Sequence, residues 1–183
     1  MNRLAKEGLL DRLTKVKLPR CKSCLAGKAT AKPFGKASRA TTPSELIHYD
    51  ICGPMSVKAR HWTNYFLTFI DDYSRYGYVY LLSHHCETLD VFKRFVVEVE
   101  TQLERRVKTL RTDRGREYLS NLFKEFCEKK GIRRQLTIPG TPQQNGVAER
   151  RNRTLLNMVR SMMAHVNLPI SFWGERCLRQ CIS

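Results

Sequence analysis

The sequence contains few acidic residues and no long apolar run. Of its 183 residues, 33 are Lys or Arg and only 17 are Asp or Glu, giving a formal net charge of +16. No stretch reaches the roughly eighteen apolar residues that a membrane-spanning helix needs. The first residues also lack the apolar segment of a secretory signal, so the seven Cys predict free thiols in a reducing compartment. These absences argue against a membrane protein and against a disulfide-stabilised secreted domain.

The positive charge is concentrated near the N-terminus. Residues 1–40 contain eleven Lys or Arg and two acidic residues, a net charge of +9. An excess of this size predicts a polyanionic partner, because neutralising phosphates releases counterions, and nucleic acid is the commonest such partner. A ribosomal or chromatin scaffold would fit the charge equally well. With 42% hydrophobic residues, the chain can still bury one core of its own.

A pair of cysteines, Cys21 and Cys24, interrupts the basic N-terminal segment. Their separation by two residues is half of a tetrahedral zinc site. The other half is missing, because no His precedes Cys21 in this sequence. The pair is therefore at most an incomplete zinc site, and we do not expect Zn²⁺ to be a cofactor of this chain.

The remaining sequence predicts a single α/β domain with three strands, a helix, a strand, a helix, a strand and a final helix. The first three strands should form an antiparallel meander, in which a short turn joins the second strand to the third. Gly131 follows the second helix in the position of a C-cap. The predicted strands are 46–51, 65–70, 76–82, 108–112 and 133–138, and the predicted helices are 88–103, 121–130 and a long one from residue 147.

Acidic residues occur at two strand ends and near the start of the last helix. Asp50 lies near the end of the first strand, Asp113 follows the fourth strand, and Glu149 lies in the first turn of the last helix. Carboxylates that converge at one sheet edge supply the oxygen ligands of Mg²⁺ or Mn²⁺. Two such ions can activate a hydroxyl and stabilise a leaving oxygen during displacement at phosphorus. The pattern predicts metal-dependent phosphoryl transfer on nucleic acid.

Other acids and potential ligands compete with this assignment. Glu149 could instead form an i, i+4 ion pair with Arg153 on a solvated helix face. Adjacent strand residues point to opposite faces, so Asp71 and Asp72 favour a turn role, capping the residues that follow them. Glu117 could add a fourth acid, although pairing with a neighbouring Arg is the simpler role. A cap or loop role is favoured for His84, His85 and Cys86, and a packing role for Trp62 and Trp173.

The sequence around the three acids resembles a known family. Asp50 in HYDICGPM, Asp113 in TDRGREY and Glu149 in TPQQNGVAERRNRTL resemble the Asp, Asp, Glu triad of retroviral-type integrases, with thirty-five residues between the last two acids. The segment FLTFIDDYSRYGYVYLL is most similar to integrases of copia-type long-terminal-repeat retrotransposons, and CKSCLAGKATAKPF resembles the end of their zinc-binding leader. Arg114 stands where many relatives have Asn, and ERCLRQCIS no longer resembles the family.

The resemblance implies a ribonuclease H-like fold, with a mixed five-stranded sheet flanked by helices and a truncated zinc-finger-like segment at the N-terminus. It implies residues 1–40 as the truncated leader and basic linker, 41–174 as the integrase catalytic core and 175–183 as a divergent tail, so the chain is expected to be a fragment. It also implies catalysis by two Mg²⁺ or Mn²⁺ ions held by Asp50, Asp113 and Glu149.

The implied function is 3′-processing and strand transfer of element DNA into target DNA, by a DNA nucleotidyltransferase of the integrase type. The implied partner is double-stranded DNA, the active form is a homo-oligomer, and the location is the nucleus, with cytoplasmic virus-like particles. A catalytically inactive DNA-binding remnant of a decayed retrotransposon is the alternative. The expected DNA contacts come from the loop 142–146 and the helix after it: Gln143, Gln144, Asn145, Arg150, Arg153, Asn157 and Arg160.

Overall fold

The computed structural model describes residues 39–113, 115, 120–137 and 145–179. All of them belong to Ser38–Ser183, one of the two units into which the chain divides. Several residues named in the sequence predictions lie outside the described residues: the leader with Cys21 and Cys24, Arg114, Glu117, Gln143 and Gln144.

The core is a mixed five-stranded sheet in the order β3-β2-β1-β4-β5. Its first three strands pair antiparallel, as predicted, while β4 pairs parallel with β1 and β5 parallel with β4. The predicted mixed five-stranded sheet is thereby confirmed. The strands are β1 (Leu46–Cys52), β2 (Tyr65–Asp71), β3 (Gly77–Leu82), β4 (Thr109–Thr112) and β5 (Arg133–Leu136).

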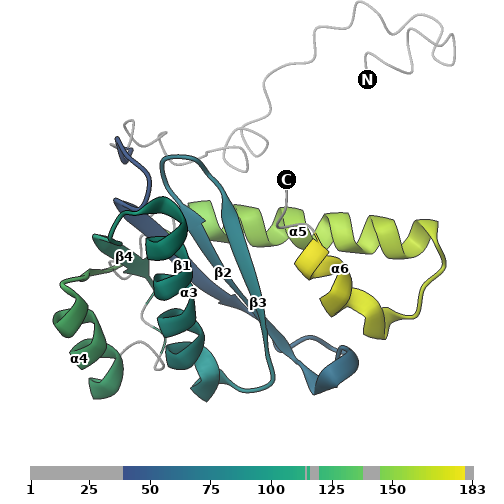
Figure 1. The fold of residues 1–183 in the computed structure, drawn as a ribbon. Helices are drawn as coiled ribbons and strands as arrows, with labels where there is room; N and C mark the ends of the chain where they lie inside the picture. Colours follow the sequence, from purple (N-terminus) through teal and green to yellow (C-terminus); the bar gives the residue numbers. More distant parts are fainter. Residues whose placement is uncertain (1–38, 114, 116–119, 138–144, 180–183) are drawn as a thin grey trace, which may run out of the picture. The chain divides into compact units, whose positions relative to one another are not determined.

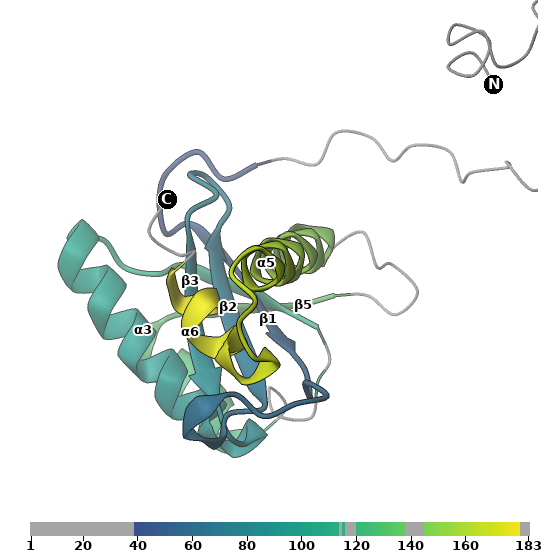
Figure 2. The same ribbon diagram turned by 90° about the vertical axis from the view of Figure 1, so that its right-hand side faces the viewer.

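Helices cover both faces of the sheet (Figures 1 and 2): α3 and α4 lie on one face, and α5 and α6 on the other. The predicted ends of α3 and α4 are confirmed. Ser120 caps α4 by accepting from the Phe123 N–H, and Gly131 ends it with a φ of 72°. The helices are α3 (Thr88–Leu103), α4 (Asn121–Lys130), α5 (Gly146–His165) and α6 (Trp173–Arg179), with short 3₁₀ turns η1 (Arg60–Trp62), η2 (His85–Glu87) and η5 (Ile170–Phe172).

The face beneath α3 and α4, called here the aromatic face, is filled by stacked rings. Phe69 and Phe95 stack at 4.0 Å between ring centroids, and Phe92 and Phe123 at 5.1 Å. The strand residues of this cluster alternate with those of the opposite face, because successive side chains of a strand point to opposite sides.

The face beneath α5 and α6, called here the α5 face, holds a smaller apolar cluster. Phe66 and Val79 from the sheet pack against Val159 of α5 and Trp173 of α6. Cys177 is fully buried in this cluster. Helix α6 spans residue 174, the expected end of the core, and contributes Cys177 to the packed interior. The boundary itself stays a prediction.

The two tryptophans have different environments. Trp173 is buried, and its indole Nε1 donates to the carbonyl of Val57 at 2.8 Å. Trp62 is 76% exposed, so the packing role expected for it is wrong, while the same expectation for Trp173 is confirmed. Trp62 lies in the β1–β2 connection with Lys58 Nζ 5.5 Å from its ring centroid, and no apolar element covers it in the described structure. Among the helices of the described residues, none combines the length and the apolar character of a membrane span.

Candidate active site

The parallel pairing of β1 and β4 brings two of the predicted acids to the same end of the sheet. His48 of β1 pairs with Arg111 of β4. Asp50 lies two residues after His48, and Asp113 lies two residues after Arg111. Because the strands are parallel, both carboxylates lie towards the carboxyl ends of β1 and β4. Two acids that are 63 positions apart in the sequence are neighbours through this register.

Helix α5 carries the third predicted acid. Its sheet-facing stripe contains Ala148, Asn152 and Leu155, which are buried at the helical spacing of three or four residues. Glu149 is one position after Ala148 and is exposed. The helix begins at Gly146 without a side-chain cap, because Asn145 turns its amide to a different partner.

That partner is Asp50. The Asn145 Nδ2 donates to Asp50 Oδ1 at 3.2 Å, and the Asn152 Nδ2 donates to Asp50 Oδ2 at 2.8 Å. The Thr68 hydroxyl of β2 in turn donates to Asn152 Oδ1 at 2.9 Å. A donor on its oxygen fixes the orientation of the Asn152 amide, because the two ends of an amide are not interchangeable as donor and acceptor. These four side chains are called here the Asp50 network.

The charge on Asp50 is costly at this position. Burial raises the pKa of Asp50 to about 6, and the hydrogen bond from Asn145 lowers it. The negative charge of Asp113 raises it further, the hydrogen bond from Asn152 lowers it, and the charge of Glu149 raises it. Asp113 and Glu149 are therefore close enough for their charges to oppose the ionisation of Asp50.

The chemistry of these side chains fits Mg²⁺ or Mn²⁺, since carboxylate oxygens are the ligands that these ions prefer. A nearby cation would also relieve the repulsion that raises the pKa of Asp50. Within the described part of the chain, however, no three His, Cys, Asp or Glu side chains are grouped closely enough to hold a metal ion.

The other acidic pair has the turn role predicted for it. Asp71 accepts from the backbone N–H of Ser74 at 2.7 Å and from its hydroxyl at 2.6 Å. Asp72 forms an ion pair with Arg75 at 2.9 Å and a buried hydrogen bond with His48 at 2.8 Å. The prediction that this pair caps the following residues is confirmed, and the buried partner His48 is an addition that the sequence did not indicate.

The second competing cluster also has the predicted role. His84 is the N-cap residue of η2, and Glu87 closes a capping box by accepting from the His84 N–H at 2.9 Å. His84, His85 and Cys86 thus form a helix start between β3 and α3, as expected for a loop or cap.

The predicted DNA contacts divide into two groups. Asn145 is 6% exposed and its side-chain amide donates to Asp50, so it lies within the site. The second group consists of predicted contacts that are exposed along α5: Arg150, Arg153, Asn157 and Arg160. Their contact with DNA stays a prediction.

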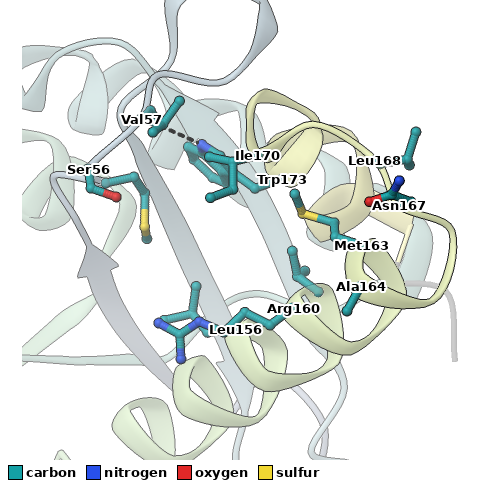
Figure 3. A pocket seen from close by; sticks show the side chains of 12 residues that line it. Ser56, Val57, Leu156, Arg160, Met163, Ala164, Asn167, Leu168, Ile170 and Trp173 are labelled. Atoms are coloured by element: carbon teal, nitrogen blue, oxygen red, sulfur yellow. Dashed lines mark hydrogen bonds between the residues drawn. The ribbon is translucent and has the colours of Figure 1, made fainter.

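Arg160 also lines an apolar pocket of about 390 Å³ on the α5 face (Figure 3). The pocket lies between the β1–β2 connection, the second half of α5 and η5. Its apolar walls include Val57, Met163 and Ile170, and Trp173 forms one side through its hydrogen bond to the Val57 carbonyl. Among the described residues that line it, Arg160 is the only charged one.

Sequence reasoning missed Thr68 and Asn152. The signal for Asn152 was present, because a polar residue interrupts the apolar stripe of Ala148, Leu155 and Val159 and is 4% exposed in the structure. A buried polar side chain needs a partner, so such an interruption predicts a hydrogen bond. No comparable signal exists for Thr68, since Thr is common in strands.

The chain matches the integrase core domain family over residues 40–142. It is 43% identical over 179 residues to the retrovirus-related Pol polyprotein from transposon TNT 1-94 of Nicotiana tabacum, a match that covers 97% of this chain. It is 34% identical over 160 residues to the transposon Ty1-NL2 Gag-Pol polyprotein of Saccharomyces cerevisiae, covering 84% of this chain. The chain spans only 14% of the tobacco polyprotein and 9% of the yeast polyprotein.

Solved structures share the fold. A chain of a simian T-cell lymphotropic virus intasome in complex with PP2A regulatory subunit B56 gamma aligns with a TM-score of 0.65 at 21% identity, covering 86% of this chain and 55% of that one. The HTLV-2 integrase catalytic core domain in complex with magnesium, in its trimeric form, aligns with a TM-score of 0.57 at 20% identity, covering 78% and 86% of the two chains. The five-stranded sheet and its helices are thus those of an integrase catalytic core, the ribonuclease H-like fold.

Proposed function

This chain belongs to the integrase core domain family, and we propose on that basis that it catalyses divalent-metal-dependent polynucleotidyl transfer. The proposed reactions are 3′-processing of element DNA and its strand transfer into target DNA. The observation that carries the proposal is the Asp50 network: a half-buried carboxylate held by two amide donors and influenced by the charges of Asp113 and Glu149. Perturbed carboxylates of this kind concentrate at functional sites.

Asp50, Asp113 and Glu149 are the residues that would hold Mg²⁺ or Mn²⁺. When bound, the two ions supply activation of the attacking hydroxyl and stabilisation of the leaving oxygen at phosphorus. The chain itself supplies orientation: Asn145 and Asn152 each donate to one oxygen of Asp50, so that carboxylate has a fixed direction. Ligand-orienting hydrogen bonds typically change metal affinity or activity by about 10–100-fold.

The proposed partner is double-stranded DNA, both the element ends and the target, and the proposed active form is a homo-oligomer in the nucleus. The HTLV-2 core domain, described in trimeric form with magnesium, supports the metal and the oligomer for this fold. The net charge of +16 supports the nucleic-acid partner.

The proposal is tested by strand transfer of a labelled terminal-repeat oligonucleotide into plasmid, in Mg²⁺, in Mn²⁺ and in EDTA. Asp50→Asn, Asp113→Asn and Glu149→Gln should each reduce transfer by about 10³-fold or more, and the defects should not be additive, because the acids act as a unit. Asp90→Asn is the matched control: Asp90 is an exposed acid of α3, on the opposite face, and its loss should change nothing. Transfer that survives Glu149→Gln would reject Glu149 as the third ligand.

A second candidate function is a DNA-binding remnant that keeps the fold without the reaction. The net charge of +16 favours it, because binding a polyanion needs that charge and no catalytic metal. Calorimetric titration with Mn²⁺ separates the two candidates. Binding by the parent that Asp50→Asn abolishes supports the enzyme, whereas duplex binding with neither Mn²⁺ binding nor strand transfer supports the remnant.

A further inference from the structure

A second hollow on the α5 face, called here the arginine cleft, is basic, and none of the described residues that line it is acidic. It has a volume of about 380 Å³ and lies between the β2–β3 turn and the first two turns of α5. Its walls come from segments about seventy residues apart in the sequence. The lining residues are Ile70, Arg75, Val147, Arg150, Arg151 and Thr154.

Arg151 places its guanidinium group over the edge strand. Its Nε lies 3.6 Å from the point where a Cβ on Gly77 would stand, so the side chain crosses from α5 to β3. This Nε is buried and has no hydrogen-bond acceptor within the described residues. A buried donor is normally paired, so Arg151 is oriented for an acceptor that this part of the chain does not supply.

Arg150 and Arg75 complete the basic lining. Arg150 folds back along α5, with Nη1 3.4 Å from the Cβ position of Gly146. Arg75 belongs to the turn and is anchored by its 2.9 Å ion pair with Asp72. Asp72 is 6% exposed and also accepts from the Ala40 N–H, so its single charge offsets one of three guanidinium groups. The Thr154 hydroxyl donates to the Arg150 carbonyl at 2.9 Å, which leaves the arginines as the side-chain donors of the cleft.

The arginine cleft is separate from the predicted acids. Val147, Arg150, Arg151 and Thr154 are spaced as i, i+3, i+4 and i+7 and share one flank of α5. Glu149 does not line the cleft, and residues at helical spacing from it, such as Arg153, lie on another flank. A ligand held in the cleft would therefore leave the carboxylates accessible.

We propose that the arginine cleft binds a backbone phosphate of DNA. Guanidinium groups match phosphate oxygens in fork geometry, and an unpaired N–H on Arg151 meets the need of such an oxygen. The contact would hold the duplex on the side of α5 away from Glu149 and would fix its position without reading its sequence. The identification of the phosphate as that of DNA rests on the proposed function.

The test is the salt dependence of duplex binding by the full chain in EDTA, with a short duplex of arbitrary sequence as the probe. Arg150→Gln combined with Arg151→Gln should lower the slope of log affinity against log salt by about 0.9, the contribution of the one phosphate contact that is lost. Arg94→Gln is the matched control, an exposed arginine in the middle of α3 on the other face, and its slope should stay within error of the parent's.

A charge-preserving variant distinguishes a lost phosphate contact from a misfolded protein. Arg150→Lys combined with Arg151→Lys should keep the slope, since lysine also neutralises phosphate, while affinity falls several-fold because the fork is lost. In the parent, the Nε–H resonance of Arg151 should shift when the duplex is added. An unchanged slope in the double Gln variant, a double Lys variant as weak as the double Gln variant, or an unmoved Arg151 resonance would each overturn the proposal.

Failure of the proposed function looks different. DNA binding is measured without metal, so it does not depend on the reaction. If the parent binds DNA with a salt slope that depends on Arg150 and Arg151 but transfers no strand, the proposed reaction is refuted and the arginine cleft is supported. Conversely, strand transfer by a double Gln variant with an unchanged slope refutes the cleft and leaves the reaction standing.

Discussion

The two faces of the sheet are built on different principles. On the aromatic face, the buried side chains are almost all apolar, and Phe69, Phe92, Phe95 and Phe123 stack on one another. On the α5 face, β1 and β2 place Asp50 and Thr68 in the middle of the sheet, where α5 covers them with Asn152. Two hollows also open on this face.

This difference separates stability from function within one small domain. Ring stacking and dense packing on the aromatic face supply apolar burial without polar groups to satisfy. The α5 face buries a carboxylate with a raised pKa, which costs free energy, and the other face compensates for that cost. Substitutions on the two faces should therefore affect different measurements.

The largest effect on folding is expected at the centre of the aromatic face. Phe92 is fully buried among other rings, so Phe92→Ala should lower the free energy of unfolding by about 3–5 kcal/mol, through lost apolar burial and the cavity left behind. Val97→Ala in the same helix is the control, because Val97 is 58% exposed and should cost less than about 0.5 kcal/mol. Urea denaturation measures both, and a loss below about 1 kcal/mol at Phe92 would break the comparison.

The next effect tests the cost of the carboxylate on the α5 face. The pKa of Asp50 is about 6 in the folded protein, above the usual value of 3.8 for an aspartate. Protonation therefore favours the folded state, and the parent should lose up to about 3 kcal/mol of stability as the pH rises from about 4 to above 6. Asp50→Asn should lack this decline when unfolding is measured in EDTA.

Asp90→Asn, which changes an exposed acid, should keep the decline of the parent. If the stability difference between the parent and Asp50→Asn stays constant between pH 4 and pH 7, the carboxylate carries no burial cost, and the two faces do not differ in this respect.

A smaller effect is expected at Thr68, where one hydroxyl orients the network. Thr68→Val keeps the shape but leaves Asn152 Oδ1 without its donor, which should cost about 1–2 kcal/mol of stability. The Asn152 amide then loses its fixed orientation, so Mn²⁺ affinity should fall about 10-fold. Thr68→Ser retains the hydroxyl and should restore Mn²⁺ affinity; a Ser variant as weak as the Val variant would show that the hydroxyl is not responsible.

The smallest effect is expected at Trp62, which belongs to neither face. Because its ring is 76% exposed, Trp62→Ala should change the free energy of unfolding by less than about 0.5 kcal/mol. Trp173→Ala removes a buried ring of the α5 face and should lower the free energy of unfolding by about 3–5 kcal/mol. Thermal melts of both variants measure the difference. A large loss at Trp62 would mean that the β1–β2 connection packs more tightly than its exposure indicates.

Much of the fold followed from local patterns. The helices α3 and α4 have the predicted limits because apolar spacing, a Ser cap and the glycine Gly131 act within a few residues of each end. The order of the three acids along the chain and their placement at element ends were also readable from the sequence, since strand ends and turns are marked by local composition.

The partners of these residues depended on the tertiary structure. Thr68 meets Asn152 across 84 positions, and Asn145 turns to Asp50 across 95, because strand order and the rotation of α5 on the sheet bring them together. The same rotation puts Arg151 over β3 and leaves Glu149 exposed. No local pattern sets that rotation, because it depends on how the apolar stripe of α5 packs onto the sheet.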